Sequence, residues 1–256
     1  MRFENILNRI AMDPTPTSDY AYFKNLGVAV CFIRKNGSSF LKHYMSCLDQ
    51  GKEFQPPTTN PHVPRKRDSL NARTSNLREI SAIFSDPSIP KVVIGRNPIL
   101  RLESAYRSRV KVHNLESYNS DYSGGWVAIR QQILGWKLGS CAADPVEAVS
   151  KGISFQELAE YVVSTPSWEL DQHYSPQVYF AATEDVEYSL VGKLEQLDSF
   201  LSDLSELVGK PQLEVPDGYR VNSAKASEES LALSGDLKAR IEARFSADFE
   251  FFGYQS

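Results

Sequence analysis

A short glycine- and serine-containing segment carries the most recognisable chemistry of this chain. Lys35 stands two residues before Gly37, and Ser38 and Ser39 follow the glycine directly. An apolar run at 28–33 precedes the segment, and apolar residues recur after it at helical spacing. A strand that turns through a glycine into a helix collects backbone N–H groups and the positive end of the helix dipole, which together bind phosphate or sulfate. From these residues alone, an anion-binding loop and a plain structural turn are equal alternatives.

A second segment repeats this organisation. The apolar run at 91–95 predicts a strand, Asn97 is a favourable helix N-cap, and Pro98 suits the first position of a helix. Ser104 lies two turns into that helix. Side chains of a helix tilt toward its N-terminus, which here is the end that follows the strand. Arg96 at the strand end and Ser104 in the helix could therefore converge on one anion.

The elements that must position these residues alternate along the chain. Strands are predicted at 28–33, 91–95, 177–181 and 187–192, and helices at 40–48, 76–84, 98–110, 154–163, 197–208 and 237–245. The stretch at 111–150 is less regular, with a flexible turn at Ser123–Gly125. This order predicts an α/β fold in which helices flank a central, mainly parallel sheet. Without repeats or a linker, residues 1–256 are predicted to form a single domain, with a lead-in at 1–26, the first loop unit at 27–50 and the second at 91–112.

Composition narrows the class of protein. The 256 residues are 41% hydrophobic and 23% charged with a net charge of −4, which argues against broad nucleic-acid binding. The three cysteines have neither paired nor metal-like spacing, so no metal is expected. No apolar stretch is long enough for a signal peptide or a membrane span. We expect a soluble, cytoplasmic protein without a membrane partner, and its oligomeric state stays open.

Five segments taken in order resemble a known family. The order Lys-x-Gly-Ser-Ser resembles the 5′-phosphosulfate loop of sulfotransferases, and the segment at 93–107 resembles the 3′-phosphate segment of the Golgi-type carbohydrate sulfotransferases (sulfotransferase family 2). Asn97 stands where that family has aspartate. Three further segments, at 171–177, 188–195 and 248–254, are similar to family patterns as well. The chondroitin and dermatan 4-O-sulfotransferase branch is the most similar, over residues 28–254.

The resemblance implies a P-loop-like sulfotransferase fold, 3′-phosphoadenosine 5′-phosphosulfate (PAPS) as the sulfonate donor, and a hydroxyl acceptor, expected on a saccharide. Lys35 is implied as a catalytic residue that also binds the cofactor, and Arg96 and Ser104 as the residues that read its 3′-phosphate. The full set implied around the cofactor is Arg34, Lys35, Asn36, Gly37, Ser38, Ser39, Phe40, Arg96 and Ser104.

The resemblance also bears on two histidines. His62 lies in a proline-rich loop, where composition alone suggests no role, but the family branch and the uronyl 2-O-sulfotransferases place a His-Val pair there. The uronyl enzymes use that histidine as a base, and an imidazole titrating near pH 6.5 suits that task. His173 is implied to brace the substrate cleft, and which of the two is the base stays open. The cysteines that the animal enzymes carry after the His173 segment are absent, as is their membrane anchor. Both departures favour a cytoplasmic bacterial relative and leave its acceptor open.

Two other classes of function remain in competition. The first is a P-loop kinase or nucleotide hydrolase, although Lys35 precedes the last glycine of the loop, whereas the Walker A lysine follows it. The second is a catalytically silent nucleotide- or sugar-binding relative, against which the joint presence of Lys35, His62, Arg96 and Ser104 weighs.

Overall fold

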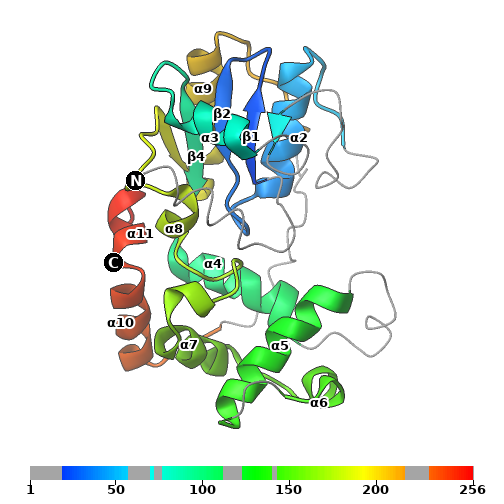
Figure 1. The fold of residues 1–256 in the computed structure, drawn as a ribbon, viewed down its shortest axis with the longest axis vertical. Helices are drawn as coiled ribbons and strands as arrows, with labels where there is room; N and C mark the ends of the chain where they lie inside the picture. Colours follow the sequence, from blue (N-terminus) through cyan, green and yellow to red (C-terminus); the bar gives the residue numbers. More distant parts are fainter. Residues whose placement is uncertain are drawn as a thin grey trace. The chain divides into compact units, whose positions relative to one another are not determined.

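A computed structural model describes residues 19–56, 70–71, 77–111, 123–139, 143–216 and 231–255. It divides into two compact units, each built from two stretches of the chain (Figure 1). The first unit comprises Met1–Arg96 and Gln177–Ser223, and the second comprises Asn97–Pro176 and Ala224–Ser256. The chain thus leaves the first unit directly after Arg96 and re-enters it at Gln177.

The first unit is organised around a five-stranded sheet of order β3-β1-β2-β4-β5. Strands β2, β4 and β5 run parallel, with Val30 opposite Val92 and Val93 opposite Val191. Strand β1 pairs antiparallel with both β2 and β3, which adds an antiparallel edge that the sequence patterns did not predict. The strands are β1 (Tyr20–Phe23), β2 (Val28–Cys31), β3 (Leu70–Asn71), β4 (Lys91–Gly95) and β5 (Leu190–Lys193). The predicted α/β fold with a central sheet flanked by helices is confirmed.

Helices cover both faces of this sheet because its strands alternate buried side chains between two sides. On one side, Val30 and Ile94 belong to a core cluster with residues of α2 (Ser38–Asp49) and α9 (Leu197–Val208). On the other side, the Tyr20 ring meets Phe84 of α3 (Leu77–Ser85) edge to face, and its hydroxyl donates to the Phe180 carbonyl of α8 (Gln177–Ala181). Figure 1 shows α3 in front of the sheet and α9 behind it.

The second unit is helical among its described residues. A fully buried arginine, Arg130 of α5, joins three of its segments, because its guanidinium donates to the carbonyls of Val110, Ala148 and Lys151. Burial lowers the pKa of this guanidinium. The elements are α4 (Pro98–Ala105), a π-helix (Tyr106–Val110), α5 (Ser123–Lys137), α6 (Pro145–Ser150), α7 (Phe155–Ser164), a 3₁₀ turn (Ser167–Glu169), α10 (Gly235–Arg244) and α11 (Ser246–Phe251).

Two predictions of secondary structure were wrong. The segment at 177–181 is the helix α8 and not a strand, and its buried residues Gln177 and Ala181 lie four apart, on one face of a helix. The stretch predicted as irregular contains α5 and α6, and Ser123–Gly125 begins α5 instead of forming a turn. The buried Arg130 interrupts the apolar face of α5, so its sequence lacks a clear amphipathic period.

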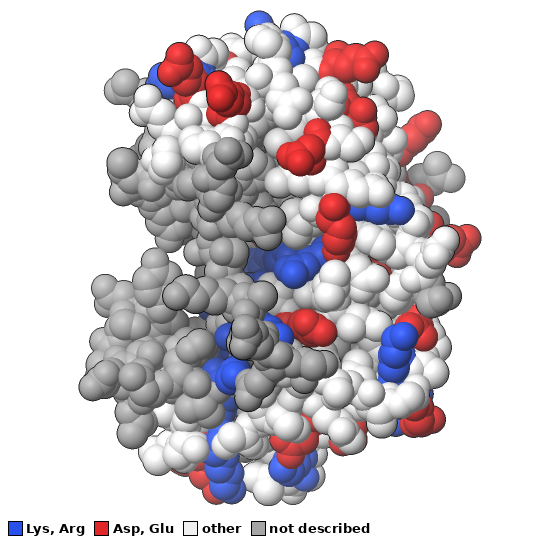
Figure 2. Space-filling model, turned by 180° about the vertical axis from the view of Figure 1, so that it is seen from behind, with Lys and Arg blue, Asp and Glu red and all other residues white. Residues whose placement is uncertain are grey.

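The described residues on one face of the molecule carry both signs of charge (Figure 2). On the face drawn in Figure 2, acidic and basic side chains are interspersed among larger uncharged areas, in keeping with the net charge of −4. Within the described ranges, no helix has the length and apolar character needed to cross a bilayer.

Candidate functional site: the loop between β2 and α2

The turn from β2 into α2 has an unusual backbone. Gly37 is the N-cap of α2 and has a left-handed conformation, φ 70°. A Cβ atom at this position would lie 2.8 Å from Leu194 Cδ1, so the space beside the glycine is already filled. Lys35 also has φ 70°, a conformation that costs a residue with a side chain about 1–2 kcal/mol. The strained lysine backbone therefore needs support from its surroundings.

Backbone N–H groups gather at the first turn of α2, where the sequence predicts an anion-binding site. The N–H of Leu41 donates to the Gly37 carbonyl at 3.0 Å, so the N–H groups of Ser38, Ser39 and Phe40 precede the first bond within the helix. The side chains of Ser38 and Ser39 are nearly buried at this end of the helix. This donor set fits a phosphate or sulfate group, which is the group that a PAPS cofactor would place there. The ring of Phe40, by contrast, is buried in the core against Tyr44 and Phe54, so only its backbone belongs to this donor set.

Asn36 and Gln177 join this loop to the end of β4. Asn36 is fully buried, and its Nδ2 donates to the Ile94 carbonyl at 2.9 Å and to Gln177 Oε1 at 2.6 Å. Gln177 Oε1 also accepts the Arg96 N–H at 3.0 Å, and Gln177 Nε2 donates to the Arg96 carbonyl at 2.8 Å. The Arg96 guanidinium in turn donates from Nη1 to the Lys35 carbonyl at 3.0 Å. Two segments that the sequence analysis placed in one site, around Lys35 and at Arg96, are thus directly hydrogen-bonded.

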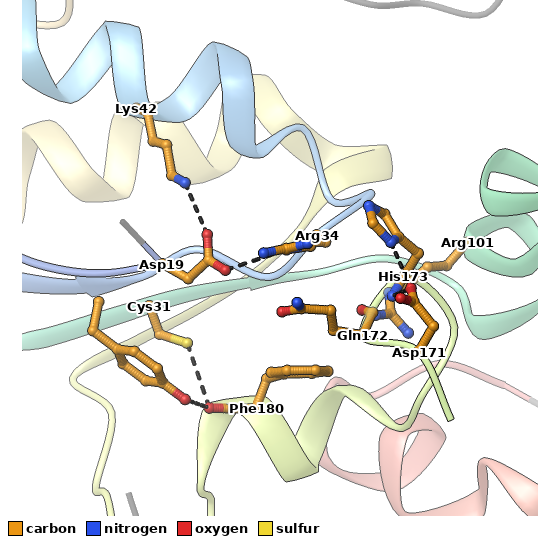
Figure 3. A network of polar contacts seen from close by, with 10 residues as sticks. Asp19, Cys31, Arg34, Lys42, Arg101, Asp171, Gln172, His173 and Phe180 are labelled. Atoms are coloured by element: carbon orange, nitrogen blue, oxygen red, sulfur yellow. Dashed lines mark hydrogen bonds and ion pairs between the residues drawn. The ribbon is translucent and has the colours of Figure 1, made fainter. Parts of the chain in front are cut away.

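An acidic residue lies between two basic residues beside the loop. The carboxylate of Asp19 forms ion pairs with Lys42 Nζ at 2.8 Å and with Arg34 Nε at 3.4 Å (Figure 3). Lys42 is nearly buried, and its ammonium also lies 5.3 Å from the centre of the Phe32 ring. Both basic side chains are therefore held beside the loop by the same carboxylate. The side chain of Arg34, predicted to bind the cofactor, therefore forms an ion pair with Asp19, a residue that no sequence pattern indicated.

Cys31, at the end of β2, is unsuited to be a nucleophile. Burial raises the pKa of its thiol to about 12, and the thiol donates to the Phe180 carbonyl at 3.7 Å. Nucleophilic cysteine chemistry requires a thiolate near neutral pH.

The other predicted 3′-phosphate residue belongs to the second unit. Asn97 caps α4 as predicted, its Oδ1 accepting the N–H groups of Ile99 at 3.0 Å and Leu100 at 3.3 Å. Ser104 is half-buried near the end of α4. Arg96 lies in the first unit, so the pairing of Arg96 and Ser104 on one phosphate stays a prediction.

The second unit also holds a histidine–carboxylate pair. Asp171 Oδ1 accepts from the backbone N–H of His173 at 2.8 Å and lies 2.6 Å from its Nδ1 (Figure 3). When neutral, the imidazole in this arrangement carries its proton on Nδ1 and its lone pair on Nε2. Arg101, fully buried in α4, supports the same segment by donating to the carbonyls of Gln172 at 2.9 Å and Ser175 at 2.6 Å.

His62, the predicted base, lies outside the described residues. Gln177 and Asp171 are the residues of interest that sequence reasoning passed over. Both stand in the segment that resembles the family pattern, and that membership was the available signal.

Comparisons with known proteins extend over nearly the whole chain. The pattern of the sulfotransferase family matches residues 18–255. Carbohydrate sulfotransferase 12 of Mus musculus is 26% identical over 248 residues, covering 89% of this chain and 58% of the mouse protein. Carbohydrate sulfotransferase 12 of Xenopus laevis is 28% identical, with coverage of 89% and 58%, and carbohydrate sulfotransferase 14 of Danio rerio is 30% identical, with coverage of 48% and 30%.

The chain therefore spans little more than half the length of the first of these relatives, 58% for the mouse protein. No solved structure matches it. The family match is continuous from before β1 to the end of α11, and so includes the hydrogen-bonded loop and the Arg96 segment. On this evidence the chain belongs to the sulfotransferase family, and the proteins that it resembles are carbohydrate sulfotransferases.

Proposed function

We propose that this protein transfers a sulfonate group from PAPS to a hydroxyl group of a carbohydrate. The observation that carries the proposal is the direct bonding of the two segments expected to bind the cofactor, through Arg96 Nη1 and the Lys35 carbonyl. Family membership and the names of the relatives support sulfonate transfer and a saccharide acceptor. A cytoplasmic location remains a prediction from the sequence.

The residues of the loop act on the charge of the donor. When bound, the cofactor supplies a sulfonate group attached to its 5′-phosphate, and this phosphate is the leaving group. The N–H groups of the first turn of α2 would hold the 5′-phosphate, and Lys35 would neutralise the negative charge of the leaving group. Arg96 and Ser104 bind the 3′-phosphate, which distinguishes this cofactor from ADP.

A histidine receives the proton of the acceptor. As the acceptor oxygen forms its bond to sulfur, His62 takes the hydroxyl proton, and His173 braces the acceptor. Charge neutralisation by protein groups makes a metal unnecessary in this mechanism. Among the residues that the structure describes, no group of histidine, cysteine or acidic side chains could hold one.

Calorimetric titration tests the proposal. The protein should bind adenosine 3′,5′-bisphosphate more tightly than ADP or ATP. Arg96→Ala should weaken the bisphosphate by about 2–3 kcal/mol, the scale of a charge-assisted contact, and should weaken adenosine 5′-phosphosulfate far less because that ligand lacks a 3′-phosphate. A preference for ATP would favour a kinase or nucleotide hydrolase, and bisphosphate binding without transfer to any acceptor would indicate a silent relative.

A further inference from the structure

Gln177 makes an unusual set of contacts for a single side chain. Its amide binds both the N–H and the carbonyl of Arg96, at 3.0 and 2.8 Å. This is the pairing that a neighbouring strand gives, and Arg96 directly follows the last residue of β4. The Gln177 amide therefore extends the sheet by one residue and fixes the backbone from which the Arg96 guanidinium projects.

The same amide also reaches the loop. Gln177 Oε1 accepts from Asn36 Nδ2 at 2.6 Å, and both side chains are fully buried. Asn36 follows Lys35, whose carbonyl accepts from the Arg96 guanidinium. These contacts form a closed ring. Three hydrogen bonds join Asn36 to Gln177, Gln177 to the Arg96 backbone, and the Arg96 guanidinium to the Lys35 carbonyl, and the peptide bond between Lys35 and Asn36 completes the ring.

The ring has a specific mechanical consequence. Asn36 lies between Lys35 and Gly37, both of which have left-handed backbones, and its fully buried side chain anchors the turn to β4 and α8. Because Gln177 Oε1 accepts from the loop and from Arg96 together, a shift of one segment costs hydrogen bonds on the other. Leaving these buried groups unpaired costs about 1–3 kcal/mol each.

We propose that Gln177 is a positioning residue that holds the 5′-phosphosulfate loop and Arg96 in register, so that the two ends of the cofactor are bound at a fixed separation. This proposal rests on the proposed function, because it takes Lys35 and Arg96 as cofactor contacts. Gln177 acts through its neighbours and does not itself touch the reacting atoms.

The test measures the affinities of two ligands for a set of variants. Adenosine 3′,5′-bisphosphate and adenosine 5′-phosphosulfate are titrated into wild type, Arg96→Ala and Gln177→Met, which keeps side-chain length and neutrality but removes the amide. Gln177→Met should weaken both ligands by about 10–100-fold, whereas Arg96→Ala should weaken mainly the bisphosphate. Leu204→Ala, which truncates a buried residue of the same unit's core, should lower the melting temperature and leave both affinities unchanged.

A double-mutant cycle isolates the link itself. Because Asn36 and Gln177 share a hydrogen bond, the losses in bisphosphate affinity from Asn36→Ala and Gln177→Met should combine to less than their product. If Gln177→Met does not fold, Gln177→Asn replaces it. The shorter asparagine keeps an amide but cannot reach Asn36 and Arg96 together, so it should weaken both ligands as well.

The outcomes separate the two proposals. If wild type binds neither ligand, the proposed function fails and the role of Gln177 fails with it. If wild type binds the bisphosphate and the Gln177 variants bind both ligands within twofold of it, the positioning role is wrong and the function stands. If the losses of ligand affinity follow the melting temperature and Leu204→Ala shows the same losses, Gln177 contributes to stability only and the positioning role is wrong.

Discussion

Lys35 combines a strained backbone with the side chain expected to stabilise the leaving group. Its φ of 70° is one of two positive values at non-glycine positions in the described part of the chain. Such strain persists only where surrounding contacts hold it, and here the Lys35 carbonyl is bound by the Arg96 guanidinium. The backbone conformation and the amine can be separated by experiment.

Replacing Lys35 by alanine or by glycine should lower kcat by about 10²–10³-fold in both cases, because either change removes the amine that we propose to stabilise charge in the transition state. The two variants should differ in stability. Lys35→Gly should be about 1 kcal/mol more stable than Lys35→Ala, because glycine adopts φ 70° without strain. Steady-state kinetics and urea denaturation measure the two effects, and near-wild-type turnover in either variant would remove Lys35 from the mechanism.

The two histidines should respond differently to substitution. His62→Ala should lower turnover by about 10²–10⁴-fold and leave bisphosphate affinity unchanged, since a base contributes to the chemical step. His173→Ala and Asp171→Asn should act on acceptor affinity or stability. The wild-type rate should fall as the pH drops and the base is protonated, and the residual activity of His62→Ala should lack this acidic limb.

The opposite pattern would change the assignment. If His62→Ala keeps full activity while His173→Ala and Asp171→Asn abolish turnover in folded protein, the base is His173. Asp171, which lies 2.6 Å from Nδ1, would then fix its tautomer.

At the scale of elements, α2 begins at Gly37, where both the backbone conformation and a neighbouring side chain disfavour a larger residue. Gly37→Ala is destabilised both by the left-handed backbone and by a contact of the new Cβ with Leu194 Cδ1 at 2.8 Å. Gly51, after the end of α2, has φ 63° but no atom within 4 Å of the position of a Cβ, so Gly51→Ala is destabilised by its backbone alone. Gly51→Ala should cost about 1 kcal/mol and Gly37→Ala about 1 kcal/mol more. Equal losses in urea denaturation would show that Leu194 yields without cost.

The first turn of α7 contains Glu157, whose ionisation should make the free energy of unfolding decrease at acid pH. Burial by itself would raise the pKa of Glu157, but hydrogen bonds from Lys137 and from Ser154, the N-cap, outweigh it and lower the pKa below the ordinary 4.5. Because the folded state favours the ionised carboxyl, its stabilisation is present above pH 4.5 and is lost as the pH falls through the lowered pKa.

The measurement is the free energy of unfolding at several pH values. The stability difference between wild type and Glu157→Gln should be constant near neutrality and shrink as the pH falls below about 4.5. Glu160→Gln serves as the matched control. It removes a carboxylate of the same helix whose hydrogen-bond donor is Gln156 and not Lys137 or Ser154. A difference that does not change with pH would contradict the role of ionised Glu157.

At the scale of the whole molecule, ligand binding and stability are linked. A ligand that binds the folded state adds about 2.7 kcal/mol at a concentration of 100 times its Kd, which for a chain of this size raises the melting temperature by roughly 5–10 °C. Adenosine 3′,5′-bisphosphate should give this shift, and ATP at the same concentration a smaller one. Equal shifts would contradict the expected preference for the bisphosphate, and a larger shift with ATP would favour the kinase or hydrolase alternative.

The sequence could predict much of the first unit's framework and of the candidate loop. The strands before each loop, the Asn97 cap of α4, the capping box of α7 and the span of α9 depend on residues within a few positions of one another. Short-range patterns report such features directly. The segment at 177–181 was misread because a five-residue segment with four apolar residues is too short to separate a strand from a helix.

By itself, the sequence determined the local chemistry of this protein. It specified a lysine, a glycine and two serines between a strand and a helix, a second strand followed by a capped helix, and an ordered set of segments that resemble the sulfotransferases, a family that the match over residues 18–255 confirms.

Only the tertiary structure decided which distant residues support that chemistry. Gln177 meets Asn36 from 141 positions along the chain and Arg96 from 81. The physical reason is that an N-cap or a turn is closed by neighbours in sequence, whereas a buried amide can be satisfied by any segment that folding brings to it. No sequence periodicity predicts the hydrogen-bond partner of a buried amide, because that partner is set only when the strands pair and the helices pack.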